Sequence, residues 1–206
     1  MKIVKQVRAA KTLEIGFAYG LSTLFICQAL ADNGGGNHTA IDPAQRTFWK
    51  SVGLANVKKA GFTDMVRFYE ACSHEILPRL LAAGEQFDFV FIDGYHVFDA
   101  VLVDFYYSDR LIQPGSYIMF HDVWMPSVRK VVAFVLRNRS YKLARLFVTS
   151  REGLVPWLRR SLKELARHPF DLYSSWFLRQ RYHVTRYVVV QKVRDDQRYW
   201  EHYRSF

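Results

Sequence analysis

The chain has 206 residues, half of them hydrophobic, and a formal net charge of +10 at pH 7. This length and composition predict one hydrophobic core in a single domain over residues 1–206, and they exclude a disordered or low-complexity chain. No apolar stretch approaches the ~18 residues of a membrane span, and the first residues lack the apolar core of a signal peptide, so we expect a cytoplasmic protein.

Apolar runs of strand length alternate with amphipathic stretches of helix length from residue 12 onward. This alternation is typical of βαβ units, and it predicts a Rossmann-like, doubly wound α/β fold with a mostly parallel sheet. The predicted strands cover residues 12–15, 39–42, 65–69, 87–93 and 115–121, and the predicted helices cover residues 22–31, 44–60, 73–83, 98–112 and 127–136. Pro78 lies inside the third predicted helix and predicts either a kink or a later start there.

After Tyr141 the regular alternation weakens, and a last strand is predicted at residues 186–193. Residues 150–182 are basic and rich in aromatic side chains, and Leu154, Leu158 and Leu162 share one helical face within them. We expect this segment to be a helical insertion, or lid, before the last strand. A basic amphipathic helix is also typical of proteins that bind a membrane surface, which is the alternative.

Positive charge is concentrated in the same part of the chain. Residues 1–125 have a net charge of −2, whereas residues 126–206 have a net charge of +12. A positive flank of this size favours an anionic neighbour, such as a phosphorylated substrate, a peripheral membrane contact or nucleic acid. A solvated basic face is the alternative explanation.

The first predicted strand runs into a glycine-spaced turn and then a helix, in the segment Leu13-Glu14-Ile15-Gly16-Phe17-Ala18-Tyr19-Gly20-Leu21-Ser22. Gly16 and Gly20 let the backbone bend sharply and let a ligand approach the free N–H groups of the helix N-terminus. The spacing is G-x-x-x-G rather than the G-x-G-x-x-G of dinucleotide-binding folds, and it favours S-adenosylmethionine (SAM) over NAD. A purely structural junction is the alternative, and Glu14 favours the binding interpretation.

Asp42 ends the second predicted strand, about 20 residues after the glycine turn, a distance typical of an acid that binds ribose hydroxyls. Alternatively, its carboxylate caps the helix that follows Pro43. The third strand is followed by Glu70-Ala71-Cys72-Ser73, where an adenine edge is expected.

Two later strands bring acids and histidines to the same edge of the predicted sheet. Asp93 and His96 follow the strand at 87–93, and His121 and Asp122 end the strand at 115–121. Paired carboxylates at this edge are candidate ligands for a divalent cation, and His96 is a candidate base because imidazole titrates near neutral pH. Capping carboxylates and ordinary hydrogen-bonded histidines are the alternative.

Together these motifs resemble the class I SAM-dependent methyltransferases. In particular they are similar to the bacterial branch of catechol O-methyltransferase-like enzymes, which carry an I-D-G-x-H segment and a terminal H-D. The resemblance covers residues 11–136. It is carried by Glu14-x-Gly16-x-x-x-Gly20-x-Ser22, Ile41-Asp42, Ile92-Asp93-Gly94-x-His96, Asp104 and His121-Asp122.

The resemblance implies a SAM site and a role for each residue in it. Gly16 and Gly20 would line the methionine and sugar of SAM, and Ser22 would help to hold its carboxylate. Asp42 would bind the ribose. The full predicted cofactor site consists of Glu14, Gly16, Gly20, Ser22, Asp42, Cys72 and Ser73, the last two facing the adenine.

The resemblance also bears on metal binding. In metal-dependent relatives an acid at the Asp93 position and an Asp-Asn pair at the Asp122-Val123 position ligate magnesium. Val123 replaces the amide here, so we expect weak or no dependence on magnesium, with His121 or His96 as possible members of a different shell around Asp93 and Asp122. His96 falls where catechol-type relatives place a basic lysine, which fits a base.

The leading hypothesis is therefore a SAM-dependent O-methyltransferase with His96 and Asp93 as catalytic residues. Its acceptor would be a small-molecule, sugar or glycan, or lipid-linked hydroxyl, and the basic half of the chain favours an anionic one. A nucleic-acid methyltransferase is the first alternative, weakened because Ile92-Asp93-Gly94-Tyr95 lacks an Asn/Asp-Pro-Pro-aromatic turn. A non-catalytic SAM-binding module is the second. Because only about 11 residues precede the first strand, the insertion or a second subunit of a homo-oligomer is expected to cover the SAM site.

Overall fold

The computed structural model describes residues 2–148 and 185–206. The strands are β1 (Lys11–Ile15), β2 (Asn37–Ile41), β3 (Val66–Tyr69), β4 (Phe87–Ile92), β5 (Ile112–His121), β6 (Tyr141–Val148) and β7 (Thr185–Lys192). The helices are α1 (Lys2–Gln6), α2 (Leu21–Asp32), α3 (Val52–Lys59), α4 (Ser73–Ala82), α5 (Phe98–Arg110) and α6 (Pro126–Asn138), with a short 3₁₀ helix at Thr63–Met65.

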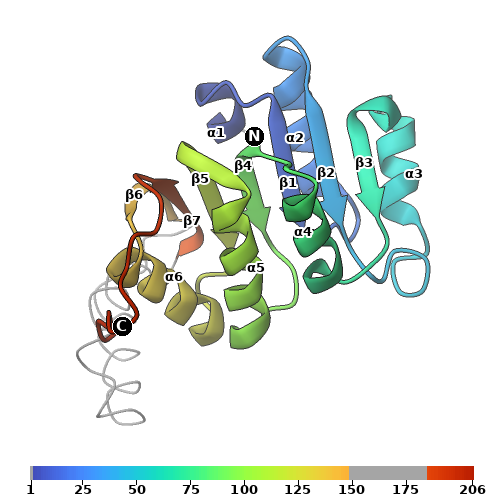
Figure 1. Ribbon diagram of the computed structural model, residues 1–206. Coiled ribbons are helices and arrows are strands. Elements are labelled where there is room, and N and C mark those ends of the chain that lie inside the picture. The colour runs from blue at the N-terminus through green and yellow to red at the C-terminus, as the bar shows by residue number, and fades with distance from the viewer. Residues whose placement is uncertain (1, 149–184) are drawn as a thin grey trace, which may run out of the picture.

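The described strands form one sheet in the order β3-β2-β1-β4-β5-β7-β6 (Figure 1). β1 to β5 are parallel, whereas β7 runs antiparallel to both β5 and β6. The predicted Rossmann-like, mostly parallel α/β fold is confirmed. The order reverses between β1 and β4, and in open α/β sheets ligands bind at the carboxyl ends of the strands beside such a reversal.

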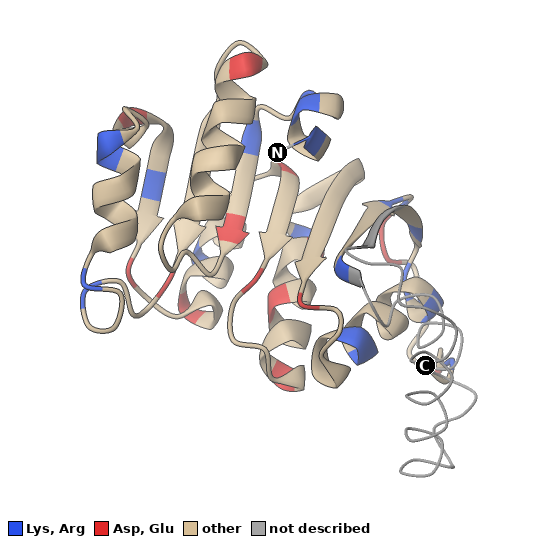
Figure 2. Ribbon diagram, turned by 180° about the vertical axis from the view of Figure 1, so that it is seen from behind, with Lys and Arg blue, Asp and Glu red and all other residues tan. Residues whose placement is uncertain are grey.

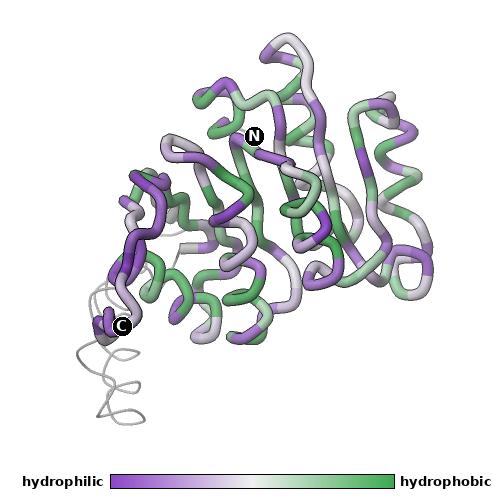
Figure 3. Tube along the Cα trace, in the orientation of Figure 1, coloured by the Kyte–Doolittle hydropathy of each residue, from purple (hydrophilic) through white to green (hydrophobic). Residues whose placement is uncertain are grey.

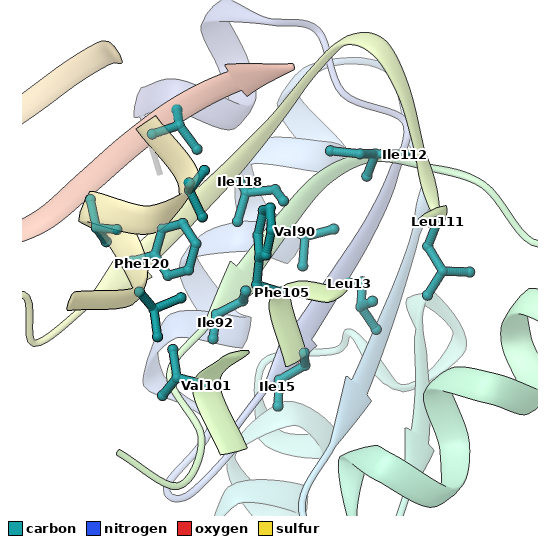
Figure 4. Close-up of a cluster of buried hydrophobic side chains, with 14 of the residues drawn as sticks. Leu13, Ile15, Val90, Ile92, Val101, Phe105, Leu111, Ile112, Ile118 and Phe120 are labelled. Carbon is teal, nitrogen blue, oxygen red and sulfur yellow. The ribbon is translucent and has the colours of Figure 1, made fainter. Parts of the chain in front are cut away.

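Two layers of helices cover the sheet. On one face, residues of α4, α5 and α6 form the largest hydrophobic cluster with alternate residues of the strands. Figure 4 shows Leu13, Ile15, Val90 and Ile92 of β1 and β4 in this cluster with Phe105 of α5. On the other face α1 and α2 pack on β4, β5 and β7, and α3 covers the turn after β1. No helix within residues 2–148 and 185–206 is long and apolar enough to cross a membrane.

Most predicted elements are confirmed within a few residues, but the helix predicted at 44–60 is wrong in its first half. Residues 44–50 form turns and α3 begins only at Val52. Lys50 and Ser51 have φ values of +50° and +58°, a left-handed conformation that no α-helix can contain. The Gln45 side chain holds this turn, because it donates to Ala18 O at 2.8 Å and accepts from Gly53 N at 3.1 Å.

Two further expectations need correction. α4 starts at Ser73 despite Pro78, so a later start is wrong. Strand β6, which begins at Tyr141, was not predicted. Its pairing with β7 shifts register between Leu143 and Arg145, and this shift breaks the alternation with a period of two that a regular strand shows. The insertion predicted at 150–182 lies outside the described residues.

The C-terminal segment after β7 is largely hydrophilic (Figure 3). It is held against α6 because Asn138 Nδ2 donates to Arg204 O at 2.8 Å and Asn138 Oδ1 accepts from Arg204 N at 2.9 Å. Beneath it the buried Asp109 carboxylate pairs with Arg139 and accepts a hydrogen bond from the Tyr141 hydroxyl at 2.7 Å. Lys192 of β7 also donates to Asp109 O at 2.6 Å, so this buried network fastens β6 and β7 to the end of α5.

Candidate active site

The glycine turn after β1 lies directly against the end of β4. Gly16 N donates to Ile41 O of β2 at 2.9 Å, and Asp93 N donates to Ile15 O of β1 at 2.8 Å. Gly16 has a φ of +93°, and a Cβ atom added to it would lie 2.1 Å from Asp93 O. Any side chain at this position would therefore push β1 and β4 apart at the point where the strand order reverses.

Glu14 lies beneath this turn and has no exposed surface. The Thr23 hydroxyl of α2 donates to its Oε2, and His38 Nε2 of β2 is 3.1 Å from the same oxygen. The other ring nitrogen of His38 lies 2.8 Å from Thr12 Oγ1. Glu14 was predicted to belong to the cofactor site. Because its carboxylate is buried, it cannot touch a ligand directly, and it can affect binding only by supporting the glycine turn.

Asp42 is also almost fully buried, and its carboxylate accepts three backbone hydrogen bonds. Oδ2 accepts from Phe17 N at 3.0 Å and from Ala18 N at 2.8 Å, and Oδ1 accepts from Ala44 N at 2.8 Å. The last bond resembles the predicted cap, but it closes a turn, since α3 begins eight residues later. Asp42 thus fixes the glycine turn from the side of β2.

Asp104 of α5 links two loops at the same edge. It is 2% exposed, and its Oδ1 has no hydrogen-bond partner among the described residues. Burial raises its pKa to about 6, although a hydrogen bond with Ser73 opposes the shift. A Cβ on Gly94 would lie 3.5 Å from Asp104 Oδ2, so this carboxyl group lies between the start of α4 and the turn after β4. Cys72 and Ser73, predicted to face adenine, are half-buried beside it.

The predicted acids and histidines come together at the ends of β4 and β5. His121 Nδ1 lies 2.5 Å from Asp93 Oδ1 and 3.6 Å from Asp122 Oδ2. His96 Nε2 lies 3.3 Å from Asp93 Oδ1 and 3.4 Å from Asp122 Oδ2. We call these four residues the Asp-His cluster. Figure 2 shows acidic segments following several strand ends along this edge.

The charges within the cluster stabilise one another. Burial alone would raise the pKa of Asp93, but hydrogen bonds from His121 and His96 lower it below its usual value. Contact with Asp93 raises the pKa of His96, against the effect of burial. His96 Nε2 is itself buried and forms no hydrogen bond of good geometry with the described residues. It faces the carboxylates of Asp93 and Asp122, which stabilise a protonated imidazole.

Neighbouring side chains hold the cluster in place. Trp124 Nε1 donates to Asp122 Oδ1 at 2.9 Å, and the Ser127 hydroxyl donates to His96 O at 2.6 Å. The Tyr187 ring of β7 lies against the His121 ring, with centroids 4.7 Å apart. The roles of Trp124 and Tyr187 were not predicted, because they depend on the loop after β5 and on the β5–β7 pairing.

The end of β5 determines which residues face Asp93. Val123 has no exposed surface and packs in the hydrophobic core, so it does not occupy the place of an amide ligand. β5 extends to His121, which pairs with Tyr187 of β7, and it is the pair His121-Asp122 that approaches Asp93. The pair of residues that faces Asp93 therefore begins one residue earlier than the resemblance implied.

A cavity of about 490 Å³ opens beside the cluster. Its polar wall contains Ser22, Asp93 and His121, and Lys2 of α1 lies at its border. The remaining wall is apolar and consists of Ile3, Leu21, Phe25, Phe91, Met119 and Tyr187. Cavities of this size accept small molecules, and a mostly apolar wall with a few polar groups is typical of them.

Sequence comparisons give one family match and a set of relatives. A family model described as a methyltransferase domain matches residues 13–123, more than half of the chain. Caffeoyl-CoA O-methyltransferase 1 of Eucalyptus globulus is 36% identical over 94 residues, which cover 45% of this chain and 37% of that protein. Catechol O-methyltransferase of Niastella koreensis is 30% identical over 125 residues, which cover 60% and 54%. The chain thus spans about half or less of these curated relatives.

Solved structures show the same fold. The O-methyltransferase TomG from Streptomyces achromogenes, in complex with SAM, has a TM-score of 0.65 at 17% identity, over 93% of this chain and 77% of that one. An O-methyltransferase from Bacillus cereus in complex with S-adenosylhomocysteine (SAH) has a TM-score of 0.56 at 20% identity, over 93% and 78%. Likeness at this level of identity shows a shared fold, and activity must be argued from the site.

The close approach at Gly16 gives a stability prediction with a matched control. Gly16 and Gly115 both have a φ above +90°, but only Gly16 has neighbouring atoms within 4 Å of an added Cβ. Gly115→Ala should lower the free energy of unfolding by roughly 1–2 kcal/mol, the cost of a left-handed alanine. Gly16→Ala should cost at least about 2 kcal/mol more, because backbone must also move. Urea unfolding measures both, and equal losses would contradict the account.

Asp104 gives a pH prediction. Its pKa of about 6 lies above the usual aspartate pKa of 3.8, so the folded protein holds this proton more tightly than the unfolded chain. Stability from this group is present below about pH 4 and is lost as the pH rises to about 6, by on the order of 3 kcal/mol. Asp104→Asn should remove that loss. Between about pH 4 and about pH 8, the unfolding free energy of wild type should therefore fall relative to that of Asp104→Asn.

The exposed Asp64 provides the control, since Asp64→Asn should leave the pH dependence as in the wild type. A parallel pH dependence for wild type and Asp104→Asn would show that Asp104 is not the titrating group.

Proposed function

The chain belongs to the methyltransferase-domain family, and on this basis we propose that it transfers a methyl group from SAM to a hydroxyl oxygen of a small molecule. The observation that carries this proposal is the contact between the glycine turn and the Asp-His cluster at one point of the sheet. The same backbone atoms join them, since Asp93 N bonds to Ile15 O and Gly16 lies against Asp93 O. A cofactor on the turn and an acceptor at the cluster would therefore be neighbours.

In this proposal SAM lies across the carboxyl ends of β1, β2 and β3. Its methionine part lies over Gly16 and Gly20, with its carboxylate near Ser22 at the N-terminus of α2. The reversal of strand order supports this placement. So does the left-handed Gly20, which precedes the free N–H groups of α2. The adenine lies near Cys72 and Ser73.

Asp42 is proposed to bind the ribose. A carboxylate offers about four acceptor positions, and the three backbone hydrogen bonds leave one of them on Oδ1. Asp42 also keeps Phe17 N and Ala18 N in place, so that the ribose contact and the shape of the turn depend on one side chain. Loss of this carboxylate should weaken SAM binding through both effects.

The acceptor is proposed to lie in the cavity of about 490 Å³ beside Asp93 and His121. Phe25, Phe91 and Tyr187 in its wall favour an acceptor with a flat, apolar body, such as an aromatic ring that carries hydroxyl groups. The relatives named for caffeoyl-CoA and catechol are consistent with such an acceptor. Lys2 at the border would suit an anionic group on the same molecule, and sugar or lipid-linked hydroxyls are the other acceptor classes.

The cluster supplies the proton transfer of this mechanism. In this proposal His96 Nε2 takes the proton of the acceptor hydroxyl once the acceptor reaches past Asp93 and His121, the two cluster members that line the cavity. Asp93 and Asp122 stabilise the imidazolium that forms. The acceptor oxygen then forms a bond to the methyl carbon while the sulfur–carbon bond breaks, which leaves a methyl ether and SAH. No covalent enzyme intermediate is needed, and the alignment of oxygen, carbon and sulfur provides much of the rate.

Calorimetry with SAM tests the cofactor site. Wild type should bind SAM, and Asp42→Asn should bind it at least about tenfold more weakly, the loss expected for a hydrogen bond to a charged group. Asp32→Asn, which removes an exposed acid at the end of α2, is the matched control. Equal affinity of Asp42→Asn and wild type would remove Asp42 from the site, and absence of SAM binding to wild type would reject the proposed function.

Transfer of labelled methyl groups tests the base. With catechol as a trial acceptor, followed by a panel of hydroxylated compounds, His96→Gln should lower kcat by roughly 10²–10⁴-fold and leave the affinity for SAM unchanged. His202→Gln, at an exposed position in the C-terminal segment, should retain wild-type turnover. Full activity of His96→Gln on an acceptor that wild type methylates would refute the assigned role.

A further inference from the structure

A group of candidate metal ligands outside the Asp-His cluster lies at the start of α4. Cys72, His74 and Glu75 each offer one ligand atom, and these atoms lie within 4.8 Å of one another. Cys72 is half-buried, whereas His74 and Glu75 are exposed. No hydrogen bond or ion pair joins any of the three side chains to another described residue, so an ion would not have to displace a partner.

The first turn of α4 brings these side chains together. Cys72 is the N-cap residue of the helix, and Glu75 follows three residues later. In many helices the side chains at these two positions face each other, usually as a serine or threonine and a glutamate that cap the helix. Cys72 has an extended backbone, but its side chain makes no capping hydrogen bond. The sequence thus places a sulfur atom where a capping hydroxyl usually lies.

Asp104 of α5 gives an independent indication of a ligand at this point. It is 2% exposed, and its Oδ1 has no hydrogen-bond partner among the described residues. It lies beside the group, because a hydrogen bond with Ser73 and the charge of His74 both act to lower its pKa. A carboxylate beside a histidine is the usual partner of an imidazole that binds a metal, since it accepts the N–H on the other side of the ring.

We propose that Cys72, His74 and Glu75 bind one zinc ion, with water as the fourth ligand. Zinc takes thiolate, imidazole and carboxylate ligands at about 2.0–2.3 Å in tetrahedral sites. Such ligand atoms lie ~3.4–3.6 Å apart, so the three side chains must approach one another by no more than about 1.5 Å. As the zinc–sulfur bond forms, the Cys72 thiol releases its proton to solvent, and the thiolate and the carboxylate balance the charge of the ion.

The sulfur ligand distinguishes this site from the rest of the chain. Cys27 is the other cysteine, and it has no exposed surface. Burial, together with the nearby charge of Glu14, raises the pKa of Cys27 to about 12, so its thiol stays protonated. The Asp-His cluster contains no cysteine. A thiolate bound to a metal ion can therefore come only from Cys72.

The zinc site overlaps the place of the adenine in the proposed function, on which this consequence rests. SAM would place its adenine near Cys72 and Ser73, at the same turn of α4. Because a bound ion would occupy that turn, zinc and SAM should exclude one another. Zinc binding itself needs neither SAM nor an acceptor, so it can be measured alone.

Cobalt, which takes the place of zinc in such sites and absorbs light, tests the ligand set in the metal-free, reduced full chain without SAM. Wild type should bind one cobalt ion per chain with a thiolate-to-cobalt charge-transfer band in the near ultraviolet, and zinc should abolish this band. Cys72→Ser should lose the band and keep the fold, because serine is a preferred N-cap residue. His74→Gln and Glu75→Gln should each weaken cobalt binding at least about tenfold.

Two kinds of control accompany these variants. His202→Gln and Glu201→Gln, at exposed positions in the C-terminal segment, should bind cobalt as wild type does. His121→Ala should keep the charge-transfer band, which separates this site from the Asp-His cluster. Absence of the band in wild type, or its survival in Cys72→Ser, would overturn the proposal. Unchanged cobalt affinity in both His74→Gln and Glu75→Gln would overturn the ligand set.

Calorimetry with SAM tests the exclusion. Zinc at about ten times its dissociation constant should weaken SAM binding to wild type about tenfold, as competition for one place requires. The SAM affinity of Cys72→Ser should not respond to zinc. Equal SAM affinity of wild type with and without zinc would overturn the exclusion. Absence of SAM binding to metal-free wild type would instead reject the proposed function and leave the zinc site in place, so the two failures give different results.

Discussion

The end of β1 passes so close to the end of β4 that only glycine fits between them, and the geometry of the whole site depends on this approach. A Cβ at Gly16 would lie 2.1 Å from Asp93 O. The glycine turn and Asp93, the first residue of the Asp-His cluster, therefore lie on opposite sides of one backbone contact. In the proposed function a cofactor and an acceptor must come into van der Waals contact, and this approach of β1 to β4 would bring their sites together before either molecule binds.

The carboxylates at this edge of the sheet differ in the groups that bind them. Glu14 is buried with His38 and Thr23, and Asp42 is bound by backbone N–H groups. These two carboxylates hold the turn. Asp93 and Asp122 instead face imidazoles beside a cavity, where a bound molecule or ion can replace a partner. Carboxylates thus support the turn in one place, and in the proposed function they take part in the chemistry in the other.

The sequence predicted the parallel part of the sheet because apolar runs, turns and helices alternate there with clear periods. It also predicted that Asp93 and His96 would meet His121 and Asp122, since the ends of parallel strands lie at one edge. It failed where conformation depends on distant partners. The left-handed Lys50 and Ser51 shorten α3, and a register shift conceals β6. The position of His121 depends on pairing with Tyr187, which lies 66 residues further along the chain.

A crystal structure of the chain with SAH tests the central claim most directly. The account predicts density for SAH across the turn from Gly16 to Gly20, with its sulfur directed toward the cavity that contains Asp93 and His121. In that position the sulfur marks where the methyl group would leave for the acceptor. SAH bound elsewhere on the protein, or bound with its sulfur directed away from the Asp-His cluster, would contradict the proposed function.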